Sequence, residues 1–198
     1  MPPEQILAFA LFTLAAAGTP GPSNVLLTAT GAQVGVLRGL PTWFGVSAGM
    51  GLMMAIVGYG LGAAVLDQPM VLKTLNWVGG GFLLWLAWKI AIAPRASGDD
   101  DQRPVGFFGA VAFQWVNPKS WIVSASASGT FLNAAAGDAL TQAVAFGAIF
   151  ALVSLPACFP WLMIGVAVRR WLATDRAHRI FNVSMALVLA GSVALILV

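Results

Sequence analysis

Two short proline-containing segments interrupt otherwise apolar stretches of this chain, and they hold the residues best suited to bind a ligand. The first is Gly18-Thr19-Pro20-Gly21-Pro22-Ser23-Asn24, and the second is Asn117-Pro118-Lys119. Pro20 and Pro118 lie 98 residues apart in a chain of 198, so each interruption falls at the same place within its half. Inside a bilayer, backbone groups freed by a proline have no water to bond. Two matched interruptions therefore indicate a substrate site in a transporter built from repeats.

The first interruption offers two kinds of binding group. Pro20 and Pro22 lack N–H groups, and Gly18 and Gly21 permit unusual backbone angles, so carbonyls before the break lose their partners and can hold an ammonium. The helix that restarts near Asn24 presents N–H groups that attract a carboxylate. Thr19, Ser23 and Asn24 add side-chain hydrogen bonds. The alternative is a plain proline kink.

The second interruption contains the one charge deep inside an apolar segment, Lys119. A charge at mid-bilayer costs about 2.5–3.5 kcal/mol, which favours a functional role, such as binding a carboxylate or exchanging a proton. The alternative is that the helix has other ends than predicted, so that Lys119 lies near the membrane surface and reaches it with its ammonium. A polar stripe at steps of three and four accompanies it: Gln114, Asn117, Trp121, Ser124 and Ser128. This stripe either lines a pathway or bonds neighbouring helices.

The candidate substrate-binding residues are accordingly Thr19, Pro20, Gly21, Pro22, Ser23, Asn24, Gln114, Asn117, Pro118, Lys119 and Ser124.

Composition indicates the elements that must position them. The chain is 59% hydrophobic and 9% charged with a mean hydropathy of +0.87, whereas soluble domains are roughly a quarter charged. We predict an all-α polytopic membrane protein with six membrane helices, of which the first and fourth are broken. The segments are 4–31, 40–66, 70–92, 106–131, 139–168 and 178–198. Pro156 and Pro160 predict a kink in the fifth.

Basic residues predict the orientation. The loops after segments one, three and five hold Arg38, Lys89, Arg95, Arg103, Arg169, Arg170, Arg176 and Arg179, whereas the other side has only Lys73. The positive-inside rule places those loops in the cytoplasm and both termini outside. Residues 94–105 then form a cytoplasmic linker between two three-helix repeats, 1–93 and 106–198. With three helices each, the second repeat must be inverted relative to the first.

Several function classes lack their sequence signals. No cluster of Cys, His and carboxylate predicts a metal site, and no cofactor motif occurs. There is no Walker loop and no Ser-His-Asp set, so neither ATP-driven transport nor an enzyme is expected. The basic residues flank apolar segments, so nucleic acid is not an expected partner. Cys158 is expected to be core packing, and His178 a solvated loop residue. Gly45-x-x-x-Gly49 in the second segment predicts close helix packing, with a homodimer as an open alternative.

The motifs resemble the LysE/RhtB family of amino acid exporters. The resemblance is carried by Thr19-Pro20-Gly21-Pro22 and by Phe107-x-Gly109 leading through Gln114 to Asn117-Pro118-Lys119, and it covers essentially the whole chain. It implies proton-driven secondary export of amino acids or similar metabolites, by antiport across a bacterial inner membrane. It alone implies export rather than import. Gln114 stands where the pattern often has Asn, and Met50 where many members have a polar or acidic residue, which implies a less polar substrate.

Two alternatives to an amino acid exporter stay open. One is an ion or metal exporter on a related scaffold. The other is a non-transporting membrane assembly subunit.

Overall fold

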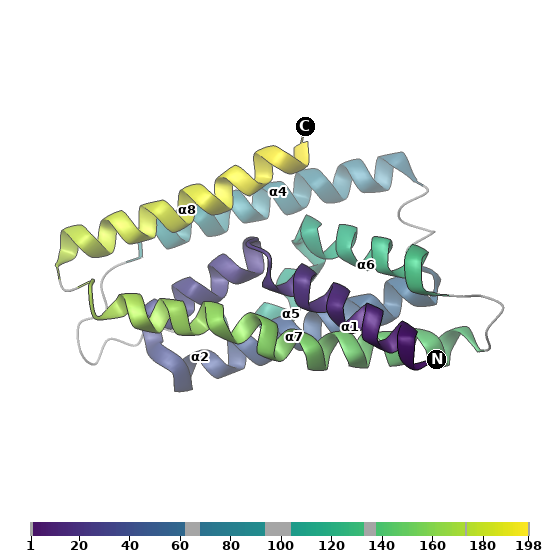
Figure 1. Ribbon diagram of the computed structural model, residues 1–198. Helices are drawn as coiled ribbons and strands as arrows, with labels where there is room; N and C mark the ends of the chain where they lie inside the picture. Colours follow the sequence, from purple (N-terminus) through teal and green to yellow (C-terminus); the bar gives the residue numbers. More distant parts are fainter. Residues whose placement is uncertain (1, 62–67, 94–103, 133–137, 173, 198) are drawn as a thin grey trace.

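The computed structural model describes residues 2–61, 68–93, 104–132, 138–172 and 174–197, and over these residues it is helical without strands (Figure 1). The helices are α1 (Pro3–Gly18), α2 (Pro22–Ile56), the short π-helical η1 (Val57–Leu61), α4 (Pro69–Ala91), α5 (Phe107–Val116), α6 (Pro118–Phe131), α7 (Ala139–Arg169) and α8 (Asp175–Leu197). The prediction of an all-α protein is confirmed. The predicted linker at 94–105 lies almost wholly outside the described residues.

Prolines and polar caps set where helices begin. α1, α2, α4 and α6 each carry proline in the first turn, where the missing N–H has no helical partner in any case. α7 begins after Asp138, whose carboxylate accepts hydrogen bonds from the Thr141 backbone N–H at 2.8 Å and the Thr141 hydroxyl at 2.7 Å. α7 continues as one helix through Pro156 and Pro160.

α2 is two helical stretches that meet at Gly35. This glycine has φ 79° and ψ −172°, in the left-handed region that favours glycine, and the chain reverses direction there (Figure 1). The predicted loop between residues 31 and 40 is therefore a sharp turn at one glycine. An added Cβ at Gly35 would also lie 3.3 Å from Arg169 Nη1.

Within the described residues, two stretches are long and apolar enough to cross a bilayer, Pro22–Gly60 and Ala139–Arg169. The first of them includes the reversal at Gly35. The described helices otherwise lie close to the six predicted segments, and the six-span inverted repeat stays a prediction.

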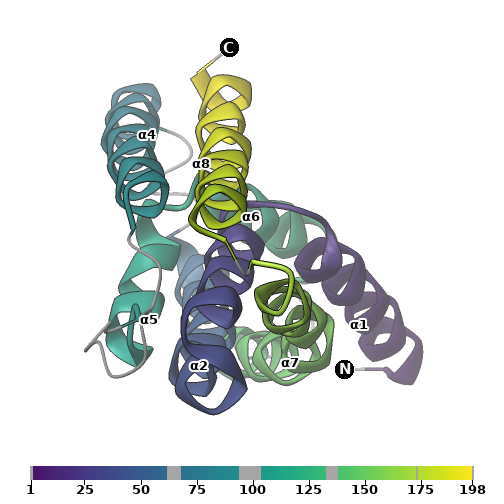
Figure 2. The ribbon, with the colours of Figure 1, turned by 90° about the vertical axis from the view of Figure 1, so that its left-hand side faces the viewer.

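Glycines bring α2 and α7 into close contact. A Cβ at Gly165 would lie 2.0 Å from the Thr28 carbonyl oxygen, and a Cβ at Gly31 would lie 2.2 Å from that of Leu162. A Cβ at Gly51 would lie 2.6 Å from the Gly147 carbonyl oxygen, and a Cβ at Gly147 would lie 2.6 Å from that of Gly51. These contacts align α7 with both stretches of α2 (Figure 2).

Gly45 and Gly49 pack against α5 of the same chain. An added Cβ would lie 2.4 Å from the Phe107 carbonyl oxygen at Gly45 and 2.8 Å from Gln114 Cγ at Gly49. The close packing predicted from this spacing is thus intramolecular, and this glycine face is not open to a second copy.

α4 and α8 form an antiparallel pair beside the other helices (Figures 1 and 2). Leu83 and Ile90 of α4 and Leu189 of α8 share an apolar cluster with Val25 of α2 and Phe113 of α5.

The prediction for His178 is wrong. It lies within α8 and is 8% exposed, with Nδ1 3.5 Å from Asn182 Nδ2, and the Asn182 amide donates to the Ala93 carbonyl at 3.0 Å. The close packing of α8 against the C-terminal end of α4 buries the His178 imidazole, although its polar neighbours in the sequence predicted a solvent-exposed position.

Candidate functional site

The first interruption leaves backbone carbonyls without backbone donors among the described residues, and side chains donate hydrogen bonds to them instead. Because Pro22 has no N–H, the Gly18 carbonyl has no helical donor, and Trp161 Nε1 of α7 donates to it at 3.2 Å. Asn24 Nδ2 donates to the carbonyls of Ala17 at 3.0 Å and Thr19 at 2.7 Å. Asn24 is buried and holds the end of α1 against the beginning of α2.

Gly18 and Gly21 do not use special backbone angles. Gly18 is the last residue of α1, and Gly21 has φ 179° and ψ −179°, an extended conformation open to any residue. The expectation of unusual angles here is wrong. Gly21 instead provides room, because an added Cβ would lie 2.8 Å from Lys119 Cδ and 3.2 Å from its Nζ.

The second interruption occurs at Asn117, which separates α5 from α6 with φ −87° and ψ 108°. Its side-chain oxygen accepts from the Lys119 backbone N–H at 3.2 Å and so caps α6.

Polar side chains connect the two interruptions. Asn117 Nδ2 donates to Ser23 Oγ at 3.0 Å, and Ser23 Oγ donates to Gln114 Oε1 at 3.0 Å. Ser120 Oγ donates to the same Gln114 oxygen at 3.0 Å. Gln114, Asn117 and Ser120 are almost completely buried, so this network ties the start of α2 to the α5–α6 junction.

Lys119 adds a second connection. Its Nζ donates to the Thr19 carbonyl at 2.6 Å and lies 3.4 Å from that of Pro20. The change of direction at Asn117 aims the half-buried lysine across Gly21 toward the first interruption.

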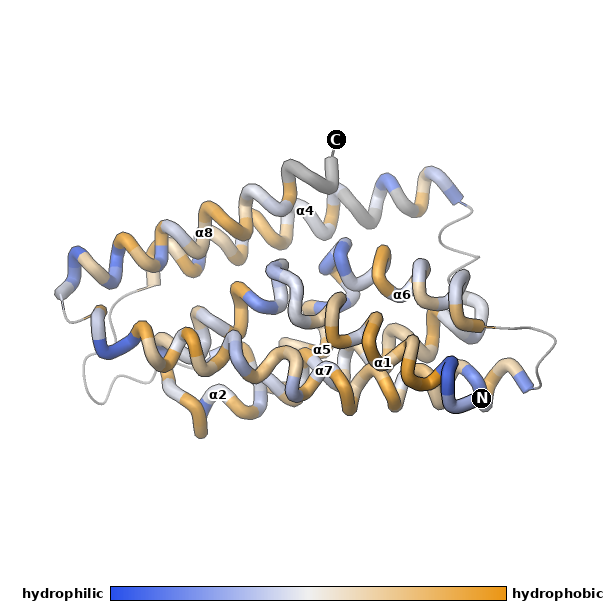
Figure 3. Tube along the Cα trace, viewed as in Figure 1, coloured by the Kyte–Doolittle hydropathy of each residue, from blue (hydrophilic) through white to orange (hydrophobic). Residues whose placement is uncertain are grey.

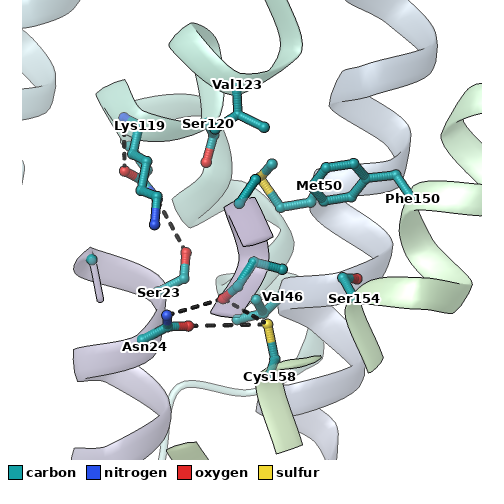
Figure 4. Close-up of a pocket in the computed structure, with 14 residues that line it drawn as sticks. Ser23, Asn24, Val46, Met50, Lys119, Ser120, Val123, Phe150, Ser154 and Cys158 are labelled. Atoms are coloured by element: carbon teal, nitrogen blue, oxygen red, sulfur yellow. Dashed lines mark hydrogen bonds between the residues drawn. The ribbon is translucent and has the colours of Figure 1, made fainter. Parts of the chain in front are cut away.

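A small cavity lies where the two interruptions meet (Figure 4). Its volume is about 30 Å³, enough for about two water molecules. It is lined by Ala16, Ala17, Gly21, Ser23, Asn24, Val46, Met50, Asn117, Lys119, Ser120, Val123, Phe150, Ser154 and Cys158. The wall is mostly apolar, with its polar groups supplied by the two interruptions, by Ser120 of α6 and by α7.

Apart from Ser124, the predicted residues have four roles in the structure. Gly21, Ser23, Asn24, Asn117 and Lys119 line the cavity. Thr19 and Pro20 supply carbonyls to Lys119, Gln114 lies behind Ser23 and Ser120, and Pro22 and Pro118 begin helices.

Ser124 does not belong with them. It is fully buried, it is not on the cavity wall, and its hydroxyl has no hydrogen-bond partner in the described part of the chain. Ser124 lies about one turn farther along α6 than Ser120, which is nearer the junction with α5 and lines the cavity instead.

Sequence reasoning missed the α7 wall. Phe150, Ser154 and Cys158 recur at steps of four, which places them on one helical face, but this spacing also fits ordinary packing. Cys158 lines the cavity, with Sγ 3.8 Å from the Ala17 carbonyl oxygen. Met50, the departure from the resembled pattern, is also on the wall.

No group of three or more His, Cys, Asp or Glu residues suited to a metal occurs among the described residues.

Comparison with known proteins identifies the family. The model of the LysE type translocator matches residues 14–198. The chain is 32% identical over 190 residues to the cysteine/O-acetylserine efflux proteins of Salmonella choleraesuis (strain SC-B67) and Salmonella typhimurium (strain LT2), covering 96% of this chain and 95% of theirs. It is 30% identical, with the same coverage, to the protein of that name in Escherichia coli (strain K12). No solved structure matches. The chain belongs to the family of LysE type translocators.

Proposed function

We propose that this protein is a secondary active exporter of amino acids or related small metabolites across the bacterial inner membrane, driven by the proton motive force. Family membership and relatives named as cysteine/O-acetylserine efflux proteins support the amino acid class. The observation that carries the proposal for the site is the meeting of two polar interruptions, distant in sequence, around one cavity.

A small, weakly polar amino acid such as cysteine or O-acetylserine suits the cavity wall. Met50, Val46 and Phe150 are apolar, while Ser23, Asn117 and Lys119 supply hydrogen-bonding groups. A cavity of about 30 Å³ does not hold an amino acid. Binding therefore requires the walls to separate, as expected for one step of an alternating-access cycle.

Two inverted repeats, residues 1–93 and 106–198, supply the moving parts in this proposal. The antiparallel α4 and α8 would be the third helix of each repeat, and the interruptions would break the first helix of each (Figure 1). Rocking of one repeat against the other would open the cavity to each side in turn.

The distribution of basic residues supports cytoplasmic loops after the odd-numbered spans. The turn inside α2, the C-terminal ends of α4 and α7 and the N-terminal end of α8 lie at one end of the molecule (Figures 1 and 3). These ends carry Arg38, Lys89, Arg169, Arg170, Arg176 and Arg179, while Lys73 lies near the beginning of α4 at the other end. Under the positive-inside rule, this arrangement supports our proposal of a topology with both termini outside.

The test is an efflux panel in intact cells. Cells making the protein are loaded with dipeptides, and external amino acids are compared with those from cells making Lys119→Ala or the control Lys73→Ala. We expect one or a few amino acids to appear faster with the intact protein and with Lys73→Ala, but not with Lys119→Ala. Equal efflux from Lys119→Ala cells, with all proteins confirmed in the membrane, would remove Lys119 from the mechanism.

Purified protein in liposomes separates the remaining alternatives. Flux of an amino acid without any other protein contradicts an assembly subunit. Flux that follows a metal gradient, and not an amino acid gradient, would instead indicate an ion exporter.

A further inference from the structure

The carbonyl oxygens of Thr19 and Pro20 form an ammonium site that the protein itself fills. Neither carbonyl is paired with a backbone N–H within the described residues. Their donors are side chains: Asn24 Nδ2 to Thr19, and the Lys119 ammonium to both. Carbonyl oxygens freed by an interrupted membrane helix are suited to bind cations.

We propose that Lys119 is a tethered competitor at this site, and that the ammonium group of a transported amino acid displaces it. The proposal rests on the export function above and names the chemical group that the site selects, a primary ammonium. It assigns to Lys119 a role other than a fixed ligand for the substrate carboxylate.

The surroundings of Lys119 permit this exchange. The lysine is half-buried and its stem lies across Gly21, whose missing side chain leaves the path to the carbonyls open. Lys119, Gly21 and Ser23 also line the cavity (Figure 4), so a ligand there lies beside the lysine whose ammonium is bound to the two carbonyls. An ammonium arriving from the cavity replaces one N–H···O contact by another of the same kind.

Displacement also has a mechanical consequence. Lys119 is the first residue after Pro118 in α6, and its ammonium ties that helix to the segment between α1 and α2. Release of this tie leaves the Ser23–Gln114–Asn117 network as the remaining direct polar link between the interruptions in the described structure. The substrate thereby loosens the contact that must open for the cavity to enlarge.

The experiment measures thermal unfolding of the purified full-length protein in detergent micelles, with propylammonium as the probe. Propylammonium replaces the side-chain atoms that Lys119→Ala removes. We expect it to raise the Tm of Lys119→Ala with a midpoint at least about tenfold lower than in the unmodified protein, because a site filled nine-tenths of the time by Lys119 weakens apparent binding by that factor. Tetramethylammonium, which has no N–H, and 1-propanol, which has no charge, should have no such effect, and Lys73→Ala should respond like the unmodified protein.

Equal responses of Lys119→Ala to propylammonium and tetramethylammonium would overturn the proposal. If that variant does not fold, Gly21→Ala decides. The extended backbone at Gly21 accepts alanine, and the added methyl group displaces the Lys119 side chain. Reductive methylation of Lys119, measured by mass spectrometry, should therefore be faster in Gly21→Ala than in the unmodified protein. An unchanged rate would contradict the proposal. Amino acid efflux without propylammonium binding leaves the export function intact and removes only this inference. Propylammonium binding without amino acid efflux would instead leave the ammonium site intact and remove the export function.

Discussion

The double substitution Asn24→Leu with Lys119→Met tests the geometry of the first interruption. Both side chains donate to the Thr19 carbonyl, at 2.7 Å from Asn24 Nδ2 and 2.6 Å from Lys119 Nζ. Leucine has nearly the shape of asparagine, and methionine keeps much of the lysine stem. Each single substitution therefore removes hydrogen bonds with little change in packing.

The structure predicts unequal effects for the single and double variants. Asn24→Leu removes the two bonds that Asn24 Nδ2 donates and the weak contact from Cys158 Sγ to Asn24 Oδ1 at 4.0 Å. The Thr19 carbonyl keeps Lys119, and the Ala17 carbonyl keeps its weak contact with Cys158 at 3.8 Å. We expect a loss of about 1–2 kcal/mol in the free energy of unfolding, given about 0.6 kcal/mol for an average hydrogen bond between membrane helices. In the double variant the carbonyl of Thr19, an exposed residue, loses both donors, and inside a bilayer a carbonyl left without a donor costs about 1–3 kcal/mol more.

The assay is a double-mutant cycle. Unfolding of the purified protein is followed by tryptophan fluorescence as sodium dodecyl sulfate is added to mixed micelles, after reversibility has been established. We expect the double variant to be less stable than the sum of the singles by about 1 kcal/mol or more, within the usual range for residues that share a partner. Asn24→Leu combined with the distant Lys73→Met should be additive. Additivity of Asn24→Leu with Lys119→Met as well would refute the shared carbonyl.

Three further predictions follow from other contacts. Gly165→Ala should destabilise the protein by about 1–3 kcal/mol in the same titration, because the added Cβ would lie 2.0 Å from the Thr28 carbonyl oxygen. Gly191→Ala, which has open space around the added Cβ, should change the stability little. Equal stabilities of the two variants would contradict the α2–α7 contact. N-acetylation of an exported amino acid removes its ammonium and should abolish its efflux in the dipeptide-fed cells, and continued export of the acetylated compound would exclude recognition by the Thr19 and Pro20 carbonyls. The hydrogen bonds from Thr141 hold the pKa of Asp138 below its usual range. The ionised Asp138 therefore contributes stability above the ordinary carboxyl pKa, and this contribution is lost as the pH falls through the lowered pKa. Asp138→Asn should flatten this acid dependence of unfolding, and an unchanged pH profile would show that the cap does not act through charge.

Local rules account for several helix starts. Pro22, Pro69 and Pro118 each mark a helix start, and Asn117 caps α6 as its residue type favours. These features depend on one turn of chain, so they can be recognised without knowing what the helix packs against. The turn at Gly35 was harder to locate, because Gly31, Gly35 and Gly39 all occur in the region and only one has a positive φ.

The site was anticipated in part. The two interruptions were recognised because proline and polar residues are unusual in apolar segments. The α7 wall was not, because Phe150, Ser154 and Cys158 are ordinary residues for a packed helix. Ser124 was included because it belongs to the polar stripe, but it lies farther along α6 than Ser120 and does not line the cavity.

The sequence alone determined that this chain is strongly apolar and helical, where its helices are interrupted, and that one lysine is embedded between apolar stretches, because composition and local backbone chemistry decide these properties. Only the tertiary structure decided that the Lys119 ammonium meets the carbonyls of Thr19 and Pro20, and that Gly21 is needed for space and not for its backbone freedom. The physical reason is that an apolar helix offers several faces of similar hydropathy. Which faces meet depends on close contacts such as Gly165 with Thr28, formed between residues more than a hundred positions apart.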